Sequence, residues 1–313
     1  MKLKKVMAVL LSSVMLLSAA ACTTGAEQTS SGAAAGATGE QSTGKAIGLS
    51  VSTLNNPFFV TLSDGAKAEA KKLGVQVTVA DAGNDTAKQT NDIEDLISKN
   101  IGVLIVNPVD SDAVSNAVKD AKSKGIKVIS VDRVVNGVDV DCKIASDNVS
   151  GAKMATEYLM SKVGKNAKIA QLEGTTGASA TIDRGKGFHQ AADGKAQIVA
   201  SQTAKFDRAT ALNVSENILQ AHGDVQGIFA QNDEMALGAV EAVAAAKKNV
   251  VIVGFDATTD GQSAVKSGKM AATVQQKPDL MGATAIDNAQ KLLKGEKVAA
   301  NVPVSVTLIT HKG

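Results

Sequence analysis

A regular alternation of short apolar runs with longer amphipathic stretches is the feature that most restricts the fold of this chain. Beyond Lys45, β-branched runs read as buried parallel strands, and the stretches between them carry apolar residues at helical spacing. In the first stretch Pro57 suits a first turn, and Gly74 ends the helix. The predicted strands cover residues 46–53, 75–81, 103–107, 126–132, 168–172, 197–201, 226–230, 250–255 and 271–275.

The number of strand–helix alternations exceeds what one sheet comfortably holds. Roughly 270 residues follow the N-terminal region, which is enough for two domains with separate cores. We therefore predict an α/β fold with two doubly wound parallel-sheet domains. In such sheets ligands bind outside the carboxyl ends of the strands.

Polar residues follow several of the predicted strands directly. Taken together they indicate a binding crevice, although each has an ordinary alternative. Asn56 and Asn232 suit helix N-caps, Asp256 could also cap a helix, and Asp132 with Arg133 could form a solvated turn pair. A single arginine on a predicted helix, such as Arg184, usually lies on the solvent-exposed face of that helix. The residues that follow strands are Asn56, Asn107, Asp132, Arg133, Asn232, Phe255 and Asp256.

The aromatic residues point to the same crevice. The chain has no Trp, one Tyr and six Phe, and its apolar runs consist of Val, Ile, Leu and Ala. Phe58, Phe59, Phe206 and Phe255 each stand beside polar planar side chains, which favours a site over core filling. Such a site suits a sugar, because aromatic rings stack on its C–H faces while charged and amide groups bond to its hydroxyls.

The N-terminus is typical of an export signal. Lysines precede an apolar run from Val6 to Leu17, which is short for a membrane span, and small residues lead to Cys22. The pattern permits simple secretion or lipid attachment at Cys22. We favour the lipid anchor, although Ala19 departs from the larger apolar residue that bacterial lipoprotein signals usually carry there. The protein would then lie on the outer face of the cell membrane, in the periplasm if an outer membrane is present.

Residues 23–44 are mostly Gly, Ala, Ser and Thr, with almost no large apolar side chains, so we predict a flexible tether. Its mean span as a random coil would be roughly 25 Å.

Metal, disulfide and nucleic-acid chemistry find little support in the sequence. Cys142 has no partner if Cys22 is acylated, and it reads as a small residue at a strand edge. The histidines at 189, 222 and 311 lie far apart, so we predict no metal site and no cofactor. A formal charge of +2, with lysines and acids interspersed, argues against a nucleic-acid partner.

Six segments in order resemble the bacterial D-ribose-binding proteins of sugar ABC importers, which have the type I periplasmic-binding-protein fold. The similarity runs from about Ala46 to the end of the chain. The segments are VSTLNNPFF (51–59), IVNP (105–108), DR (132–133), IASDN (144–148), AQNDEMALG (230–238) and VGFD (253–256).

The resemblance implies a set of sugar-binding residues from both domains. The surroundings of Arg184 depart from the family's more charged run, so its orientation is the least constrained. The implied residues are Ser52, Asn56, Phe58, Phe59, Asn107, Asp132, Arg133, Arg184, Phe206, Asn232, Phe255, Asp256 and Gln276.

The same resemblance implies three hinge crossings, near Ser146, Lys277 and Ser305. Residues 45–146 with 277–305 would form the N-terminal domain, and residues 147–276 with 306–313 the C-terminal domain. Closure of the two domains around D-ribose would create the form that a membrane permease recognises, and we expect a monomer.

Other functions share this architecture. An enzyme is disfavoured because the sequence has no nucleophile elbow, zinc signature or glycine fingerprint in the right context. The effector core of a sugar-responsive repressor is disfavoured because the export signal occupies the place of its DNA-binding helices. Presentation of the closed form to a chemoreceptor would use the same pocket. Within the binding class, allose, another pentose or a furanose-like signal molecule is the alternative ligand.

Overall fold

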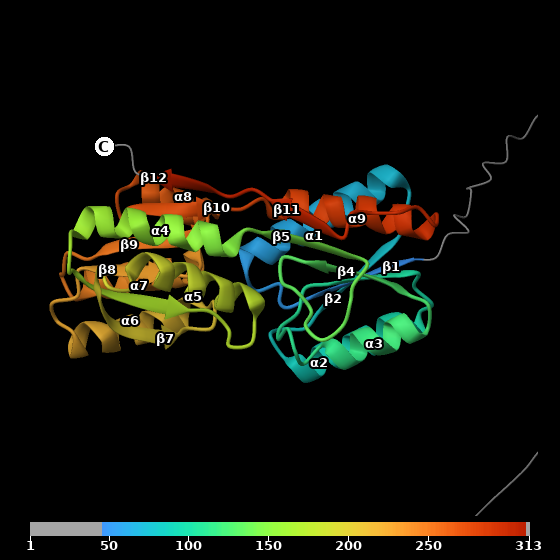
Figure 1. The fold of residues 1–313 in the computed structure, drawn as a ribbon, viewed down its shortest axis with the longest axis horizontal. Coiled ribbons are helices and arrows are strands. Elements are labelled where there is room, and N and C mark those ends of the chain that lie inside the picture. The colour runs from blue at the N-terminus through green and yellow to red at the C-terminus, as the bar shows by residue number, and fades with distance from the viewer. Residues whose placement is uncertain (1–45, 311–313) are drawn as a thin grey trace, which may run out of the picture. The chain divides into compact units, whose positions relative to one another are not determined.

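The computed structural model describes residues 46–310, in which two six-stranded sheets each carry helices on both faces (Figure 1). The predicted α/β fold with two doubly wound domains is confirmed. We call the part built on the first sheet the N-lobe and the part built on the second sheet the C-lobe.

The N-lobe sheet is parallel throughout, with strand order β11-β5-β4-β3-β1-β2. Helices α1 and α9 pack together over one face, while α2 and α3 cover the other. Its strands are β1 (Ile47–Val51), β2 (Val77–Asp81), β3 (Val103–Val106), β4 (Lys127–Val131), β5 (Cys142–Ser146) and β11 (Asn301–Val304). Its helices are α1 (Pro57–Leu73), α2 (Thr86–Ser98), α3 (Ser115–Ser123) and α9 (Pro278–Leu293).

The C-lobe sheet has the order β12-β10-β9-β8-β6-β7, in which only β12 runs antiparallel to its neighbour. Helices α4 and α5 cover one face, and α6, α7 and α8 cover the other. Its strands are β6 (Lys168–Glu173), β7 (Gln197–Thr203), β8 (Gly227–Ala230), β9 (Val251–Asp256), β10 (Ala272–Gln275) and β12 (Thr307–Thr310). Its helices are α4 (Asn148–Val163), α5 (Ser179–Ala192), α6 (Arg208–Ala221), α7 (Asp233–Ala245) and α8 (Thr259–Lys266).

Within residues 46–310 the chain passes between the sheets three times. The passages join β5 to α4, β10 to α9, and β11 to β12. Each passage is only a few residues long, so three short connections join the lobes. This arrangement is suited to a hinge.

All nine predicted strands are present, and the first helix, Pro57–Leu73, begins at Pro57 and is ended by Gly74 as expected. The Asn56 side chain accepts a hydrogen bond from the Phe58 amide, and Gly74 ends the helix with φ 66° in the left-handed region. Strands β5, β11 and β12 were missed. A loop without a helix joins β4 to β5, and β11 contains Pro303, which sequence reasoning places at sheet edges.

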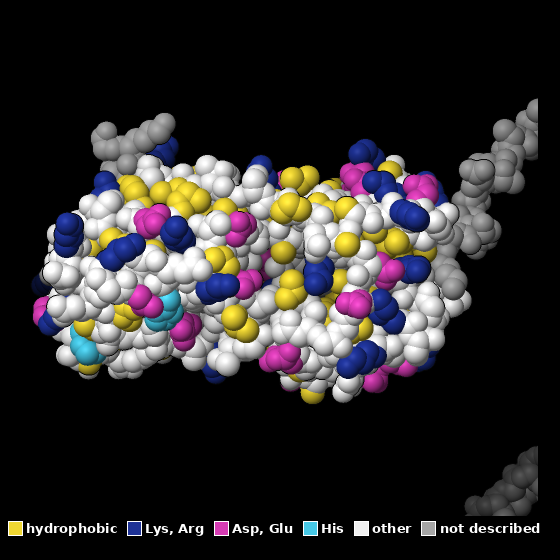
Figure 2. Space-filling model, in the orientation of Figure 1, with side chains coloured by type: hydrophobic (Ala, Val, Ile, Leu, Met, Phe, Trp, Pro, Cys, Tyr) yellow, Lys and Arg dark blue, Asp and Glu magenta, His cyan; other side chains and the backbone are white. Residues whose placement is uncertain are grey.

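The predicted export signal, the lipidation site Cys22 and the tether at 23–44 lie outside the described residues. No helix between residues 46 and 310 is long and apolar enough to cross a membrane. On the face of the molecule drawn in Figure 2, Lys and Arg side chains are interspersed with Asp and Glu.

Candidate functional site

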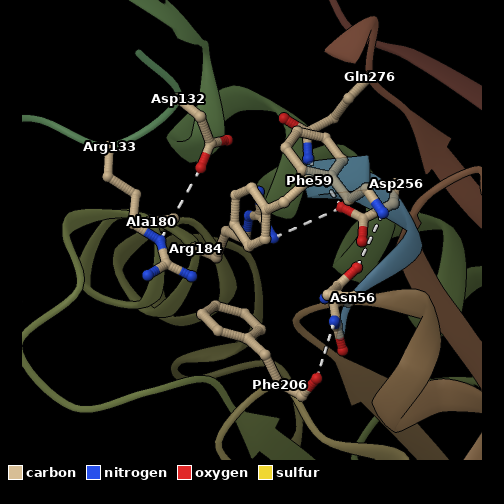
Figure 3. A pocket seen from close by; sticks show the side chains of 11 residues that line it. Asn56, Phe59, Asp132, Arg133, Ala180, Arg184, Phe206, Asp256 and Gln276 are labelled. Atoms are coloured by element: carbon tan, nitrogen blue, oxygen red, sulfur yellow. Dashed lines mark hydrogen bonds and ion pairs between the residues drawn. The ribbon is translucent and has the colours of Figure 1, made fainter. Parts of the chain in front are cut away.

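A small cavity lies between the carboxyl ends of the strands of the two sheets. Both lobes supply its walls, and Figure 3 shows Asp132 and Arg133 approaching it from one side and Asp256 and Gln276 from the other. The lining residues are Asn56, Phe58, Phe59, Asp132, Arg133, Ala180, Arg184, Phe206, Asn232, Asp256 and Gln276.

Two asparagines that line the cavity also begin helices. Asn56 caps α1, and Asn232 caps α7 by accepting a hydrogen bond of 2.9 Å from the Met235 amide. The N-cap alternatives from the sequence are therefore confirmed for both residues, and each also faces the cavity. The amide nitrogen of Asn232 donates to the Phe206 carbonyl at 3.3 Å, which ties it to the neighbouring loop.

Asp132 and Arg133 are buried, with 3 % of each exposed, so the solvated turn pair is wrong. Asp132 Oδ2 accepts a hydrogen bond of 3.0 Å from Asn107, and Arg133 Nη1 donates to the Pro108 carbonyl at 2.8 Å. Between them, Arg133 Nε lies 3.8 Å from Asp132 Oδ2, which is too long for a hydrogen bond. Both side chains are thus fixed at one end and retain bonding capacity at the other.

On the C-lobe side, Arg184 is 3 % exposed, so the alternative that it lies on a solvent-exposed helix face is wrong as well. Its Nε donates to Asn148 at 2.8 Å and its Nη1 to the Gln231 carbonyl at 2.6 Å. Asp256 Oδ1 lies 3.8 Å from Arg184 Nη1 and accepts a hydrogen bond of 2.7 Å from Gln276. Asp256 does not cap α8, because Thr258 is the N-cap of that helix.

Burial shifts the pKa of each of the four charged groups in the direction that favours its uncharged form. It raises the pKa of Asp132, although Arg133 and Arg184 act in the opposite direction, and it raises the pKa of Asp256 well above its usual range against Arg184. It lowers the pKa of Arg184 and brings that of Arg133 to about 10. The charges are therefore poorly solvated where they stand.

Three buried polar atoms of the lining residues have no hydrogen-bond partner among residues 46–310. They are Asp132 Oδ1, Arg133 Nε and Gln276 Oε1. An unsatisfied buried polar atom costs about 1–3 kcal/mol, and more if it is charged. Two of these atoms accept hydrogen bonds and one donates, which is the complement of a molecule with several hydroxyl groups.

Phenylalanine rings complete the walls. Arg133 lies with its Cζ 5.2 Å from the centre of the Phe59 ring and 5.3 Å from that of Phe206. Phe58 and Phe59 contact each other edge to face at 5.2 Å. The Phe206 ring lies against the backbone of Gly174, where an added Cβ would approach Phe206 Cζ to 2.0 Å.

Ser52, Asn107 and Phe255 lie outside the lining. Asn107 Oδ1 accepts from the Ser52 amide at 3.2 Å, and its Nδ2 donates to Asp132, so this pair supports the wall from behind. Phe255 is fully buried and lies under Arg184, whose Cζ is 3.9 Å from the ring centre. The remaining phenylalanines, Phe188 and Phe229, stack on each other in the C-lobe core.

Sequence reasoning missed Ala180. It precedes Arg184 by four residues in α5, so the two side chains share one helical face. Once Arg184 is assigned to the cavity, this spacing could have identified Ala180 too.

Stacking surfaces, paired acids and bases, and amides suit the reversible binding of a small polyhydroxylated molecule. No cluster of three or more His, Cys, Asp or Glu that could hold a metal ion occurs in the described part of the chain.

Comparison with known proteins agrees with this geometry. Residues 47–297 match the family described as periplasmic binding protein domain. The chain is 54 % identical to the ribose import binding protein RbsB of Haemophilus influenzae over 266 residues, which is 85 % of this chain and 91 % of that protein. It is 49 % identical to the Bacillus subtilis RbsB over 266 residues, which is 85 % of this chain and 87 % of the relative.

A solved structure with the same fold is the Caulobacter myo-inositol binding protein bound to myo-inositol. Its TM-score is 0.81 at 35 % identity, and the match covers 85 % of this chain and 93 % of the other. Fold, strand-end site and sequence similarity lead to one conclusion: this chain belongs to the periplasmic binding protein family.

Proposed function

We propose that this protein binds D-ribose outside the cytoplasm and delivers it to the permease of an ABC importer. The observation that carries the proposal is the set of unpartnered buried atoms on Asp132, Arg133 and Gln276, which face one small cavity. Ribose hydroxyls both donate and accept, so one sugar can satisfy all three. Relatives named as ribose import binding proteins support ribose over other polyols.

In the proposed mechanism Asp132 and Asp256 accept hydroxyl protons while Arg133 and Arg184 donate. Hydrogen bonds to charged groups contribute about 1.5–3 kcal/mol each. Phe58, Phe59 and Phe206 stack on the sugar ring. Because the contacting groups come from both lobes, ribose stabilises the closed arrangement over an open one, and the permease recognises the closed form.

Substitution of Asp256 by Ala tests this pocket. We expect D-ribose affinity to fall by at least about 100-fold. The substitution removes two charge-assisted hydrogen bonds, and each contributes more than about tenfold to the affinity. Isothermal titration calorimetry of ligand-free protein measures the change.

The matched control is Asp193→Ala, which changes the same residue type at an exposed position of the C-lobe, at the end of α5. It should bind ribose as the wild type does. A D-ribose affinity of Asp256→Ala within about twofold of that of the wild type would contradict the proposed sugar-binding pocket.

A calorimetric panel of D-ribose, D-allose, other pentoses and myo-inositol separates ribose from the alternative ligands. Sites that form hydrogen bonds to the hydroxyl groups of a sugar discriminate strongly between sugars, because a missing hydroxyl leaves a buried polar group unpaired. We expect ribose to bind tightest. Tighter binding of D-allose or of another pentose would change the assigned sugar while leaving the binding function intact.

We further propose that the protein binds its ligand without chemical change and is not an enzyme. Paired acids and bases and aromatic rings line one small cavity, and they account for binding without a reactive nucleophile. NMR of D-ribose after long incubation with the protein should show the sugar unaltered. The appearance of a product would overturn this part.

A lipid anchor at Cys22 is our proposal for localisation, and the folded part would act as a monomer. We expect Cys22→Ser to release the protein from the membrane into the soluble extracytoplasmic fraction or the medium. Fractionation and immunoblotting of cells that express each form measure this. A mutant still bound to the membrane would instead indicate an uncleaved apolar segment.

A further inference from the structure

Asp233 is fully buried beside the proposed pocket, yet it does not line the cavity. It is the first residue of α7, and its side chain points toward the β9–α8 loop and toward β10. Oδ2 accepts from the Thr258 amide at 2.8 Å and from the Thr258 hydroxyl at 3.1 Å. Oδ1 accepts from the Thr273 hydroxyl at 2.6 Å. One carboxylate thus joins three chain segments.

Each of the two threonine hydroxyls has a second hydrogen-bond partner. The Thr258 hydroxyl accepts from the Gly261 amide at 3.1 Å, and the Thr273 hydroxyl accepts from the Ala257 amide at 3.2 Å. Each hydroxyl donates its single proton to Asp233 while it accepts from the amide. In this arrangement the ionised carboxylate accepts at both oxygens, and an amide side chain would turn its NH₂ group toward one of these donors.

Two glycines leave room for this carboxylate. A Cβ at Gly254 would lie 2.4 Å from Asp233 Oδ1, and a Cβ at Gly261 would lie 2.0 Å from Oδ2. Both glycines have ordinary backbone angles, since neither is among the residues with positive φ. Their lack of a side chain is therefore explained by the space that Asp233 occupies.

The segment held by Asp233 carries Asp256. Asp256 has φ 127° and Ala257 has φ 55°, both in regions that side chains other than glycine rarely adopt. The amide of Ala257 is bonded to the Thr273 hydroxyl, which is in turn bonded to Asp233. Strained backbone of this kind persists only where neighbouring contacts hold it.

We propose that Asp233 is a positioning residue for sugar binding, which acts through Thr273 and Thr258 to hold the strained Asp256–Ala257 turn and thereby aim the Asp256 carboxylate into the cavity. This inference rests on the proposed function, because it takes Asp256 as a ligand of the sugar. Asp233, which directly follows the Asn232 N-cap, would thus contribute to sugar binding although it does not line the cavity.

The test compares Asp233→Asn, Thr273→Val and the double variant in calorimetric titrations with D-ribose. We expect Asp233→Asn to lower the affinity by about tenfold or more and Thr273→Val by about threefold to tenfold. Because both substitutions act on one chain of hydrogen bonds, the double variant should bind D-ribose with about the affinity of whichever single variant binds it more weakly. Thr273→Val is nearly isosteric and decides the question if Asp233→Asn does not fold.

Thr156→Val is the matched control. Thr156 is fully buried in α4 of the same lobe, and its hydroxyl donates to the Ala152 carbonyl at 2.8 Å, away from the cavity. It should lower stability while ribose affinity stays within about twofold of the wild type. An equal affinity loss in Thr156→Val would show general destabilisation and overturn the proposal, as would additive losses in the double variant.

A second readout needs no sugar. Amide hydrogen exchange measured by NMR should be faster at Ala257 in Asp233→Asn and in Thr273→Val than in the wild type, and unchanged in Thr156→Val. Should wild-type protein fail to bind D-ribose, the proposed function falls, and this exchange rate alone decides whether Asp233 holds the turn. Unchanged protection at Ala257 in both variants would refute the positioning role.

Discussion

At the scale of single residues, the cavity depends on backbone conformations that most side chains avoid. Asp132 has φ 63°, Phe206 has φ 59° and Asp256 has φ 127°. Such conformations cost about 1–3 kcal/mol each and persist only where surrounding contacts fix them. Asp132 is held by Asn107, and the Phe206 carbonyl accepts from Asn232. The protein thus gives up stability at these positions in exchange for side-chain direction.

Asp233 supplies a prediction about pH. Burial raises its pKa from an ordinary value of 3.8 to about 7, while hydrogen bonds from Thr273 and Thr258 lower it and Glu234 raises it further. A carboxyl with a raised pKa favours the folded state most fully below pH 3.8, and this contribution is lost as the pH rises through about 7.

Between about pH 4 and 7 the wild type should therefore lose stability relative to Asp233→Asn, which does not titrate. Urea denaturation of both proteins without sugar, across this range, measures the difference in the free energy of unfolding. Asp233 also raises the pKa of its buried neighbour Asp256, so the difference between the two proteins reports both coupled carboxyls, and both shifts act in the same direction. A difference that stays constant with pH would contradict the assignment.

At the scale of helices, glycines set how closely paired helices approach. Within α1, a Cβ at Gly65 would lie 2.3 Å from the Asp279 carbonyl, and within α9 a Cβ at Gly282 would lie 2.0 Å from the Leu62 carbonyl. Helix pairs α4/α5 and α6/α7 have similar contacts at Gly187 and Gly238. The backbone of each helix therefore packs directly against its partner, which gives both lobes rigid walls behind the site.

We expect Gly65→Ala and Gly282→Ala each to lower the free energy of unfolding by about 1–3 kcal/mol or more, because the added methyl group overlaps backbone that cannot move aside easily. The control is Gly185→Ala in α5, where the nearest atoms to an added Cβ are at 3.6 Å. There alanine should stabilise the helix by up to about 1 kcal/mol. Chemical denaturation measures all three, and equal effects at the three positions would contradict the packing argument.

At the scale of the whole described chain, hydrogen bonds at the cavity rim join the two lobes. The Ser111 amide donates to the Gly177 carbonyl at 3.0 Å, and the Ser179 amide donates to the Ser111 hydroxyl at 3.1 Å. The Ser179 hydroxyl accepts from the Val134 amide at 3.0 Å. None of these groups lines the cavity, so they favour closure without contacting a sugar.

Ser111→Ala and Ser179→Ala should therefore weaken D-ribose binding by about threefold to tenfold each, since a hydrogen bond contributes about 0.5–1.5 kcal/mol and exists only in the closed form. Calorimetry measures the affinity. Ser161→Ala on the exposed side of α4 is the control and should have no effect. Unchanged affinity in both rim variants would show that these bonds do not contribute to closure.

Much of this architecture follows from the sequence because local patterns decide it. Apolar runs predict the strands, and a residue that follows a parallel strand must lie at the edge where ligands bind, as Asn56, Asp132 and Asp256 do. Arg184 and Ala180 could not be placed this way. They lie on a helix, and which helical face meets the cavity is decided by packing against the sheet. Asp233 was missed because its partners, Thr258 and Thr273, are distant in sequence.

The last two strands belong to different lobes, and both stand at sheet edges. Strand β11 pairs with β5 in the N-lobe, and β12 pairs with β10 in the C-lobe. A polypeptide made from its N-terminus onward cannot complete either sheet until residues 301–310 have left the ribosome. If the chain is exported, this late completion leaves time for a translocation channel to capture it before it folds.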